Sequence, residues 1–209
     1  MKKFLLSLIA LCCLVTANAQ TFRIGPALSG SINLSEGTKT RLGFAVGAKG
    51  EINFRNSENS GFVDASVLFQ NTNRCSEDYF NTETKINQHW TYSTYSIFIP
   101  VSVGYKFYVS DKLNAFAAFG PYVDFGIAGK SKVVSSDRRA KNIEKNIFSN
   151  VYTDNLFNRV NFGLHAKVGF EIMQHYQISL SYNRGFTNLF KNGSNVKAQD
   201  FHLGIAYMF

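Results

Sequence analysis

The residues best suited to chemistry are charged side chains that recur on one face of alternating segments. Their types allow proton transfer, ion pairing or gating inside a shared cavity. We expect eight of them to share an interior: Lys49, Glu51, Asp64, Lys106, Asp124, His165, Lys167 and Glu171. Arg23 and Arg184 are further candidates for the same face. Because buried charges persist only when they are paired and hydrogen-bonded, the pattern favours a structural ion-pair network over a catalytic or gating cluster.

His165 is the member of this set best suited to act as a general base. A hydrolase would place it near a nucleophile and a carboxylate. No serine has a recognisable nucleophile context, and the chain is short for a ten-stranded protease barrel. The other histidines of the expected mature chain, His89, His175 and His202, fall on different segments. We therefore predict that the protein is not an enzyme and has no catalytic residue, no metal and no cofactor.

A second set of charges lies in the stretch 129–155. Its cations are Lys130, Lys132, Arg138, Arg139, Lys141 and Lys145. A solvated loop explains most charge runs of this kind. The functional interpretation is a basic surface loop that contacts anionic polysaccharide, lipid headgroups or a partner protein. The formal net charge is +8, but an exported chain meets little nucleic acid, so we expect membrane-surface partners and no nucleic acid.

The first nineteen residues have the order of a secretory signal peptide. Lys2 and Lys3 precede an apolar run from Phe4 to Val15, and Ala17-Asn18-Ala19 supplies the small residues of a cleavage site. The run is too short to span a bilayer as a helix. We predict a cleaved signal peptide at 1–19 and one domain at 20–209.

Cysteine usage agrees with export. Cleavage after Ala19 removes Cys12 and Cys13 and leaves Cys75, which alone cannot form an internal disulfide. Lipoprotein processing at Cys12 or Cys13 is the alternative, and the bulky Leu11 before Cys12 disfavours it. We expect Cys75 to be an incidental thiol in a long loop.

Eight segments with period-two alternation follow the signal. In the last one, Leu203, Ile205 and Tyr207 alternate with smaller or polar residues. Such alternation indicates a strand that separates two environments. The segments span about residues 22–34, 42–54, 62–71, 94–107, 113–128, 160–172, 176–183 and 201–209. Because no apolar run after the signal is long enough for a helix to span a bilayer, a membrane form must be built from strands.

A soluble sandwich also alternates, with its apolar face inward. Two features favour an outward apolar face. The links 55–61, 110–112 and 173–175 are short, whereas 72–90 and 129–155 are long, an asymmetry typical of outer-membrane barrels. Aromatic residues also bracket the aliphatic stretches, as rings do at the two membrane interfaces. The belt at the short links is Phe54, Tyr105, Phe107, Phe170, Tyr176, Tyr207 and Phe209, and the belt near the long links is Phe44, Phe69, Tyr92, Tyr95, Phe125, Phe157 and Phe162.

Several short stretches carry a family resemblance. They are Ile99-Pro100-Val101 through Tyr105-Lys106-Phe107, Gly120-Pro121-Tyr122-Val123, Asn161-Phe162-Gly163-Leu164, Gly185-Phe186-Thr187-Asn188-Leu189 and the terminal Leu203–Phe209. In order and spacing, they resemble the small outer-membrane β-barrel family that includes PorT-like proteins of Gram-negative bacteria. The resemblance implies an outer-membrane barrel and no enzyme activity. The end of the chain, with Tyr207 and Phe209, also looks like the signal read by the barrel-insertion machinery.

The combined expectation is an all-β protein: an eight-stranded antiparallel up-and-down transmembrane barrel, monomeric, in contact with outer-membrane lipid. We predict a non-enzymatic structural or surface-binding role. The alternatives are a PorT-like accessory of protein secretion or envelope assembly, an outer-membrane lipid-modifying enzyme and a narrow channel. The channel is disfavoured because side chains fill the interior of an eight-stranded barrel.

Overall fold

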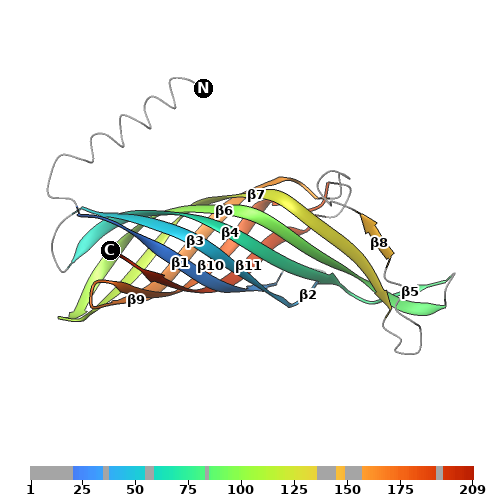
Figure 1. Cartoon of the computed structure of the whole chain (residues 1–209), viewed down its shortest axis with the longest axis horizontal. Helices are drawn as coiled ribbons and strands as arrows, with labels where there is room; N and C mark the ends of the chain where they lie inside the picture. The colour runs from blue at the N-terminus through green and yellow to red at the C-terminus, as the bar shows by residue number, and fades with distance from the viewer. Residues whose placement is uncertain are drawn as a thin grey trace, which may run out of the picture.

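Each predicted segment forms one strand of a closed ring in the computed structural model (Figure 1). The structure describes residues 21–34, 38–54, 59–82, 85–135, 145–148, 157–191 and 195–209. The ring strands are β1 (Thr21–Asn33), β3 (Arg41–Asn53), β4 (Ser60–Ser76), β6 (Ile86–Ser110), β7 (Leu113–Ser135), β9 (Val160–Ile172), β10 (Tyr176–Asn188) and β11 (Lys197–Tyr207). Three short strands, β2 (Thr38–Lys39), β5 (Tyr79–Asn81) and β8 (Lys145–Phe148), pair with β4, β6 and β7 outside the ring.

Antiparallel pairing of neighbours closes the ring. Consecutive ring strands pair with each other, and β11 returns to β1 with Leu28 opposite Ile205. The predicted all-β, up-and-down barrel is therefore confirmed. In the part of the chain that the structure describes, no helix has the length and hydropathy needed to cross a membrane. The predicted signal peptide lies outside the described residues.

The two faces of each strand differ as the alternation predicts. On β3, Phe44 is 46% exposed while its neighbour Ala45 is fully buried. Large apolar side chains cover the outside, and small or polar side chains together with a few aromatic rings fill the inside. Two predicted belt residues are exceptions: Tyr92 shares the parity of the inward Thr94, and Phe157 precedes β9 and is buried. Their rings pack against each other at 5.3 Å, so their assignment to the outer belt was wrong.

The two ends of the barrel differ in their connections. At the short-turn end, two residues join β6 to β7, and a tight turn at Met173 and Gln174 joins β9 to β10. At the long-loop end, strands run further than the alternation predicts. β6 has 25 residues and β7 has 23, against 13 in β1, β3, β9 and β10. Much of the predicted loops 72–90 and 129–155 is therefore strand, because backbone pairing continues where the apolar face has ended.

Candidate functional site

A network of charges fills the lumen near the short-turn end. Each member comes from an inward position of a ring strand, and nearly all are buried. We call it the lumen network, and it consists of Arg23 (β1), Lys49 and Glu51 (β3), Asp64 (β4), Lys106 (β6), Lys167 and Glu171 (β9) and Gln177 (β10). Six of the eight residues predicted to share an interior are brought together here.

Two carboxylates form the half of the lumen network nearest the short-turn end. Glu51 accepts hydrogen bonds from Arg23, from Lys106 Nζ at 2.5 Å and from Gln177 Nε2 at 2.9 Å. Glu171 accepts from the same three side chains, with Arg23 at 2.6 Å and Lys106 at 2.7 Å. Each charge therefore has an oppositely charged partner and a further hydrogen bond, which is what burial of a charge requires.

Asp64 contacts two further lysines on the side of Glu51 and Glu171 that faces the long-loop end. Its carboxylate lies 2.9 Å from Lys49 Nζ and accepts a hydrogen bond from Lys167. Lys49 also donates to Gln177 Oε1 at 2.5 Å, which links the two halves. Strands β1, β3, β4, β6, β9 and β10 are thus tied to one another across the interior.

Aromatic rings pack beneath these ammonium groups. Lys106 Nζ lies 5.4 Å from the ring centre of Phe62, and Lys49 Nζ lies 5.6 Å from that of Phe116. The two rings meet edge to face at 6.1 Å. Gly104 makes room for them, since a Cβ there would lie 2.6 Å from Phe62 Cζ. Cation–π contacts of this kind are stronger when the cation is desolvated.

His165 and Asp124 lie outside the lumen network. His165 shares a 2.5 Å hydrogen bond between Nδ1 and Asn183 Oδ1 and packs edge-on against Phe98 at 6.3 Å. Asp124 is half-buried nearer the long-loop end, and its Oδ1 has no hydrogen-bond partner among the described residues. Both face inward as predicted, but they lie closer to the long-loop end than the lumen network does. Residues on the same face of a strand are spaced along the barrel axis, so a shared face does not bring them together.

Arg184 points the other way. It is exposed on the outer face of β10, between the inward Asn183 and Gly185. Its expected interior position was wrong, because the alternation of β10 continues without interruption through this residue.

Three polar residues of the interior were left out of the predicted interior set. Gln177 completes the lumen network, and Arg74 lies 3.9 Å from Asp200 higher in the lumen. Arg74 and Asp200 stand beyond the predicted ends of their segments, although each keeps the parity of its strand's inward face. Extending the period by a few residues would have found them.

A layer of apolar side chains separates the lumen network from Arg74 and Asp200. Ala45, Leu68, Phe98 and Tyr122 form an apolar cluster that fills the barrel at mid-height. A hollow of about 70 Å³ remains beside Phe98. Ion pairs near the short-turn end and packed rings at mid-height together plug the interior. Because the charges of the lumen network are paired with one another, they have little freedom for acid–base chemistry.

The described part of the basic stretch 129–155 lies on strands. Lys130 and Lys132 lie on β7, where they pair with Ser93 and Thr91 of β6. Lys145 begins β8. Arg138, Arg139 and Lys141 fall outside the described residues.

Cys75 lies in β4 and is fully buried, with its thiol directed to the carbonyl oxygen of Ser76. The expected loop position was wrong, because β4 extends past the predicted segment. Across the described ranges, no group of three histidine, cysteine, aspartate or glutamate side chains is arranged to hold a metal ion.

The last residues complete the short-turn end. Tyr207 pairs with Tyr176 of β10, and the Phe209 amide donates to the Ile24 carbonyl oxygen at 2.9 Å. The Phe209 ring is 70% exposed on the outside. A chain end of this kind is an outward aromatic edge at the membrane interface.

The comparison with family models decides the classification. The sequence matches the outer membrane protein beta-barrel domain over residues 4–209. The chain belongs to this family. It is therefore an outer-membrane protein that contacts lipid with its apolar outer face. No curated protein matches the chain.

Solved outer-membrane proteins of low sequence identity are similar to this chain. Ail of Yersinia pestis is 16% identical with a TM-score of 0.41, covering 92% of this chain and 100% of Ail. Neisserial surface protein A is 12% identical with a TM-score of 0.44, and the match covers 92% and 100% of the two chains. OprG of Pseudomonas aeruginosa is 10% identical with a TM-score of 0.42, covering 93% and 98%.

Proposed function

We propose that this protein is a non-enzymatic surface-binding barrel, anchored in the outer membrane and displaying a binding ribbon outside the cell. The observation that carries the proposal is the length of β6 and β7, which have nearly twice as many residues as β9 and β10. They remain paired from Ser110 opposite Leu113 to Gln88 opposite Ser135. In Figure 1 this β6–β7 ribbon projects beyond the ring and carries β5 at its far end.

Membrane anchoring alone does not require such a ribbon. A transmembrane strand needs about 9–11 residues, so roughly half of β6 and β7 stands beyond the bilayer. The turn asymmetry supports an orientation in which this end faces outside the cell. Strands that continue past the membrane hold a fixed surface in place, which loops of the same length would not.

The chemistry of the β6–β7 ribbon suits an anionic polysaccharide. Lys130 is exposed and Lys132 is half-buried on β7, while Phe80 in β5 is 60% exposed. Trp90 and Tyr92 stack at 6.3 Å with nearly parallel rings on the opposite face of the ribbon, because they lie across from Val133 and Ser131 and not from the two lysines. The lysines can pair with sulfate or carboxylate groups, and an exposed ring such as Phe80 can pack on a sugar face.

An acidic residue organises the neighbouring cations. Asp78 accepts a hydrogen bond from Lys39 Nζ at 2.7 Å, and its other oxygen lies 3.1 Å from His89 Nδ1. The hydrogen bond to Asp78 raises the pKa of Lys39 above its ordinary value. Lys39 and Asp78 are both exposed, so solvent screens their ion pair. The pair is therefore better suited to positioning the Lys39 side chain than to stabilising the fold.

The interior gives no support to the alternative of a lipid-modifying enzyme. Ser29 Oγ lies 3.4 Å from His202 Nδ1, which places a hydroxyl beside a possible base. His202 Nε2 has no hydrogen-bond partner among the described residues, so the carboxylate of a triad is missing there. The pair also lies inside the filled lumen, where a lipid substrate has no entry.

Binding of an envelope protein is the second candidate function. Strands β5 and β8 pair on one side only within the described residues, with β6 and β7 respectively. A free strand edge can accept a strand from another protein. This geometry suits the PorT-like accessory role, in which the partner would be a component of secretion or envelope assembly.

Heparin binding tests the polysaccharide proposal. We expect refolded protein to bind immobilised heparin at low salt and to release it as ionic strength rises. Lys130→Gln combined with Lys132→Gln should weaken binding several-fold, about 1 kcal/mol for the loss of two exposed ion pairs. Lys112→Gln in the opposite turn is the matched control and should bind as the unmodified protein does. Equal losses from both ends would show that net charge, not the ribbon, causes retention.

A further inference from the structure

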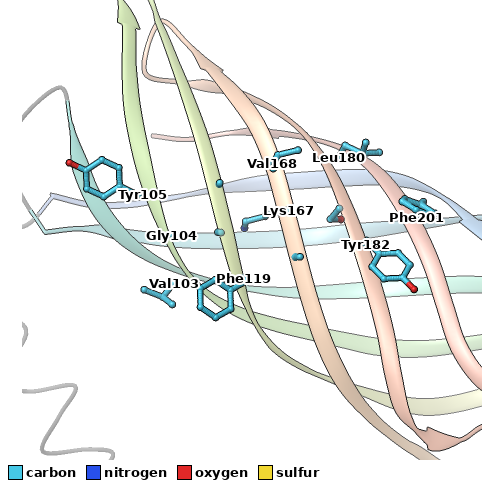
Figure 2. A pocket seen from close by; sticks show the side chains of 13 residues that line it. Val103, Gly104, Tyr105, Phe119, Lys167, Val168, Leu180, Tyr182 and Phe201 are labelled. Atoms are coloured by element: carbon cyan, nitrogen blue, oxygen red, sulfur yellow. The ribbon is translucent and has the colours of Figure 1, made fainter.

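The lipid-facing wall of the barrel has a hollow on the side formed by β6, β7, β9, β10 and β11. Its volume is about 600 Å³, within the range of about 300–1,000 Å³ found for small-molecule pockets. Figure 2 looks onto it, with Phe119, Tyr182 and Phe201 at its sides. We call it the wall hollow.

Register explains why the wall hollow exists. Ala117 faces Tyr105 on one side and Val168 on the other, and Ala166 lies between Phe119 and Tyr182. Two outward methyl groups therefore form a low floor among large neighbours. A barrel wall that merely needed apolar cover would gain area from larger side chains at these two positions.

An arginine stands at the end of the wall hollow nearest the long loops. Tyr182 and Phe201 close the hollow with rings 4.9 Å apart, and Arg184 is the next outward residue on β10, about 7 Å further along the strand. Beyond it, Phe162 and Phe186 form another ring pair at 6.2 Å. Arg184 is thus set between two aromatic pairs on the lipid-facing surface.

This position is costly for a charge that has no partner. Within the described chain, Arg184 has no ion pair or side-chain hydrogen bond. It is also the one charged side chain of the described strands that points outward between two aromatic neighbours, Tyr182 and Phe186, on its own strand. A cation facing lipid is destabilising, most strongly at mid-membrane and least near the interface. An anionic group in the lipid would remove this cost.

We propose that the wall hollow and Arg184 bind a phosphorylated glycolipid of the outer leaflet. One acyl chain lies in the hollow over Ala117 and Ala166, and a headgroup phosphate pairs with the Arg184 guanidinium. Arginine suits this role because its planar fork donates two hydrogen bonds to one phosphate. Gln199, opposite Arg184 on β11, and the half-buried Lys197 supply further donors on the headgroup side. The choice of leaflet follows from the turn asymmetry, which places the long-loop end outside.

Lipid binding by refolded protein in detergent tests the proposal, with native mass spectrometry as the readout. The probes are diphosphorylated lipid A and a neutral galactolipid. The unmodified protein should bind one lipid A about tenfold more tightly than the galactolipid, the effect of one charge-assisted contact. Arg184→Gln should abolish this preference and leave galactolipid binding unchanged. Ala166→Trp, which fills the floor, should weaken both lipids.

Arg41→Gln is the matched control, because Arg41 is also exposed near the long loops but does not line the wall hollow. It should preserve the preference for lipid A. Heat-dependent gel mobility shows that each variant is folded, and Ala117→Trp replaces Ala166→Trp if the latter does not fold. The proposal is overturned if the unmodified protein shows no preference, if Arg184→Gln retains it, or if Arg41→Gln loses it to the same extent.

Discussion

Glu51 lies among three cations, and its loss should unbalance the lumen network. Arg23 and Lys106 both donate to it, and Lys49 lies 3.7 Å away. Glu51→Gln keeps the shape but leaves buried cations short of a partner, so we expect a loss of about 3–5 kcal/mol in the free energy of unfolding. Urea unfolding in lipid vesicles measures it. Glu77→Gln, at an exposed position beyond the ring, should change stability by less than about 0.5 kcal/mol; equal effects would mean that the lumen network is not stabilising.

Neighbouring residues on β9 should respond differently to substitution. Val168 is 55% exposed to lipid, whereas Lys167 is buried beside Asp64. Val168→Arg should cost about 2–4 kcal/mol if the residue is near mid-membrane. Lys167→Met should destabilise less, because Asp64 keeps Lys49 as a partner. Adding Asp64→Asn should recover part of the Lys167→Met loss and none of the Val168→Arg loss, which a double-mutant cycle measures.

At this scale the sequence predicts the face of a residue better than its partner. Parity placed Lys49, Glu51 and Lys167 inside, as the structure does. It did not say which carboxylate pairs with Lys167, and the structure shows that Asp64 from β4 does. Partners depend on the stagger between strands distant in sequence, and that stagger is set by turns and by closure of the ring, which local alternation does not encode.

At the scale of a strand, Gly104 fixes how closely β6 approaches its neighbours. A Cβ on this residue would lie 2.5 Å from the Ala117 carbonyl oxygen and 2.6 Å from Phe62 Cζ. Gly104→Ala should therefore destabilise the barrel by about 1–3 kcal/mol through overpacking. Gly30→Ala on β1 is the control, since nothing lies within 4 Å of a Cβ there. A neutral Gly104→Ala in the same unfolding assay would mean that the wall can relax.

The turn between β9 and β10 has two non-glycine residues with positive φ angles, a backbone strain that substitution can relieve. Met173 and Gln174 have φ angles of 52° and 61°, which glycine and asparagine adopt more easily. Met173→Asn with Gln174→Gly should stabilise the protein by about 1 kcal/mol, measured as a higher urea midpoint. Lys112→Gly in the β6–β7 turn should not stabilise, because its φ is not positive. A lower midpoint for the double variant would show that the side chains removed matter more than the backbone.

For the whole molecule, the turn asymmetry predicts which end faces outward. In a Cys75→Ser background, Asn81→Cys and Lys130→Cys should react with an impermeant maleimide on intact cells, and Asp111→Cys should not. Labelling of Asp111→Cys alone would place the β6–β7 ribbon in the periplasm and end the surface-binding proposal. Permeabilised cells, in which all three sites should react, control for access to each thiol.

The number of strands and the ring could be predicted, but the lengths of strands could not. Eight alternating segments with unequal links specify a barrel because lipid requires an apolar outside and no open edge. Past the bilayer this requirement ends, and β6 continues through Tyr92 and Trp90 with no apolar face to mark it. Backbone pairing with β7 on one side and with β4 on the other holds it there.

Pairing of β1 with β11 makes the first and last strands of the ring direct neighbours. Until Phe201 to Tyr207 have crossed the inner membrane, β1 has no partner on that side, and neither does β10. Completion of the wall is therefore a timed event, reached only when the last strand of the ring arrives. A chain that lacks this strand would have two unpaired strand edges. Periplasmic chaperones and proteases would bind or cleave such a product before it inserts into the membrane.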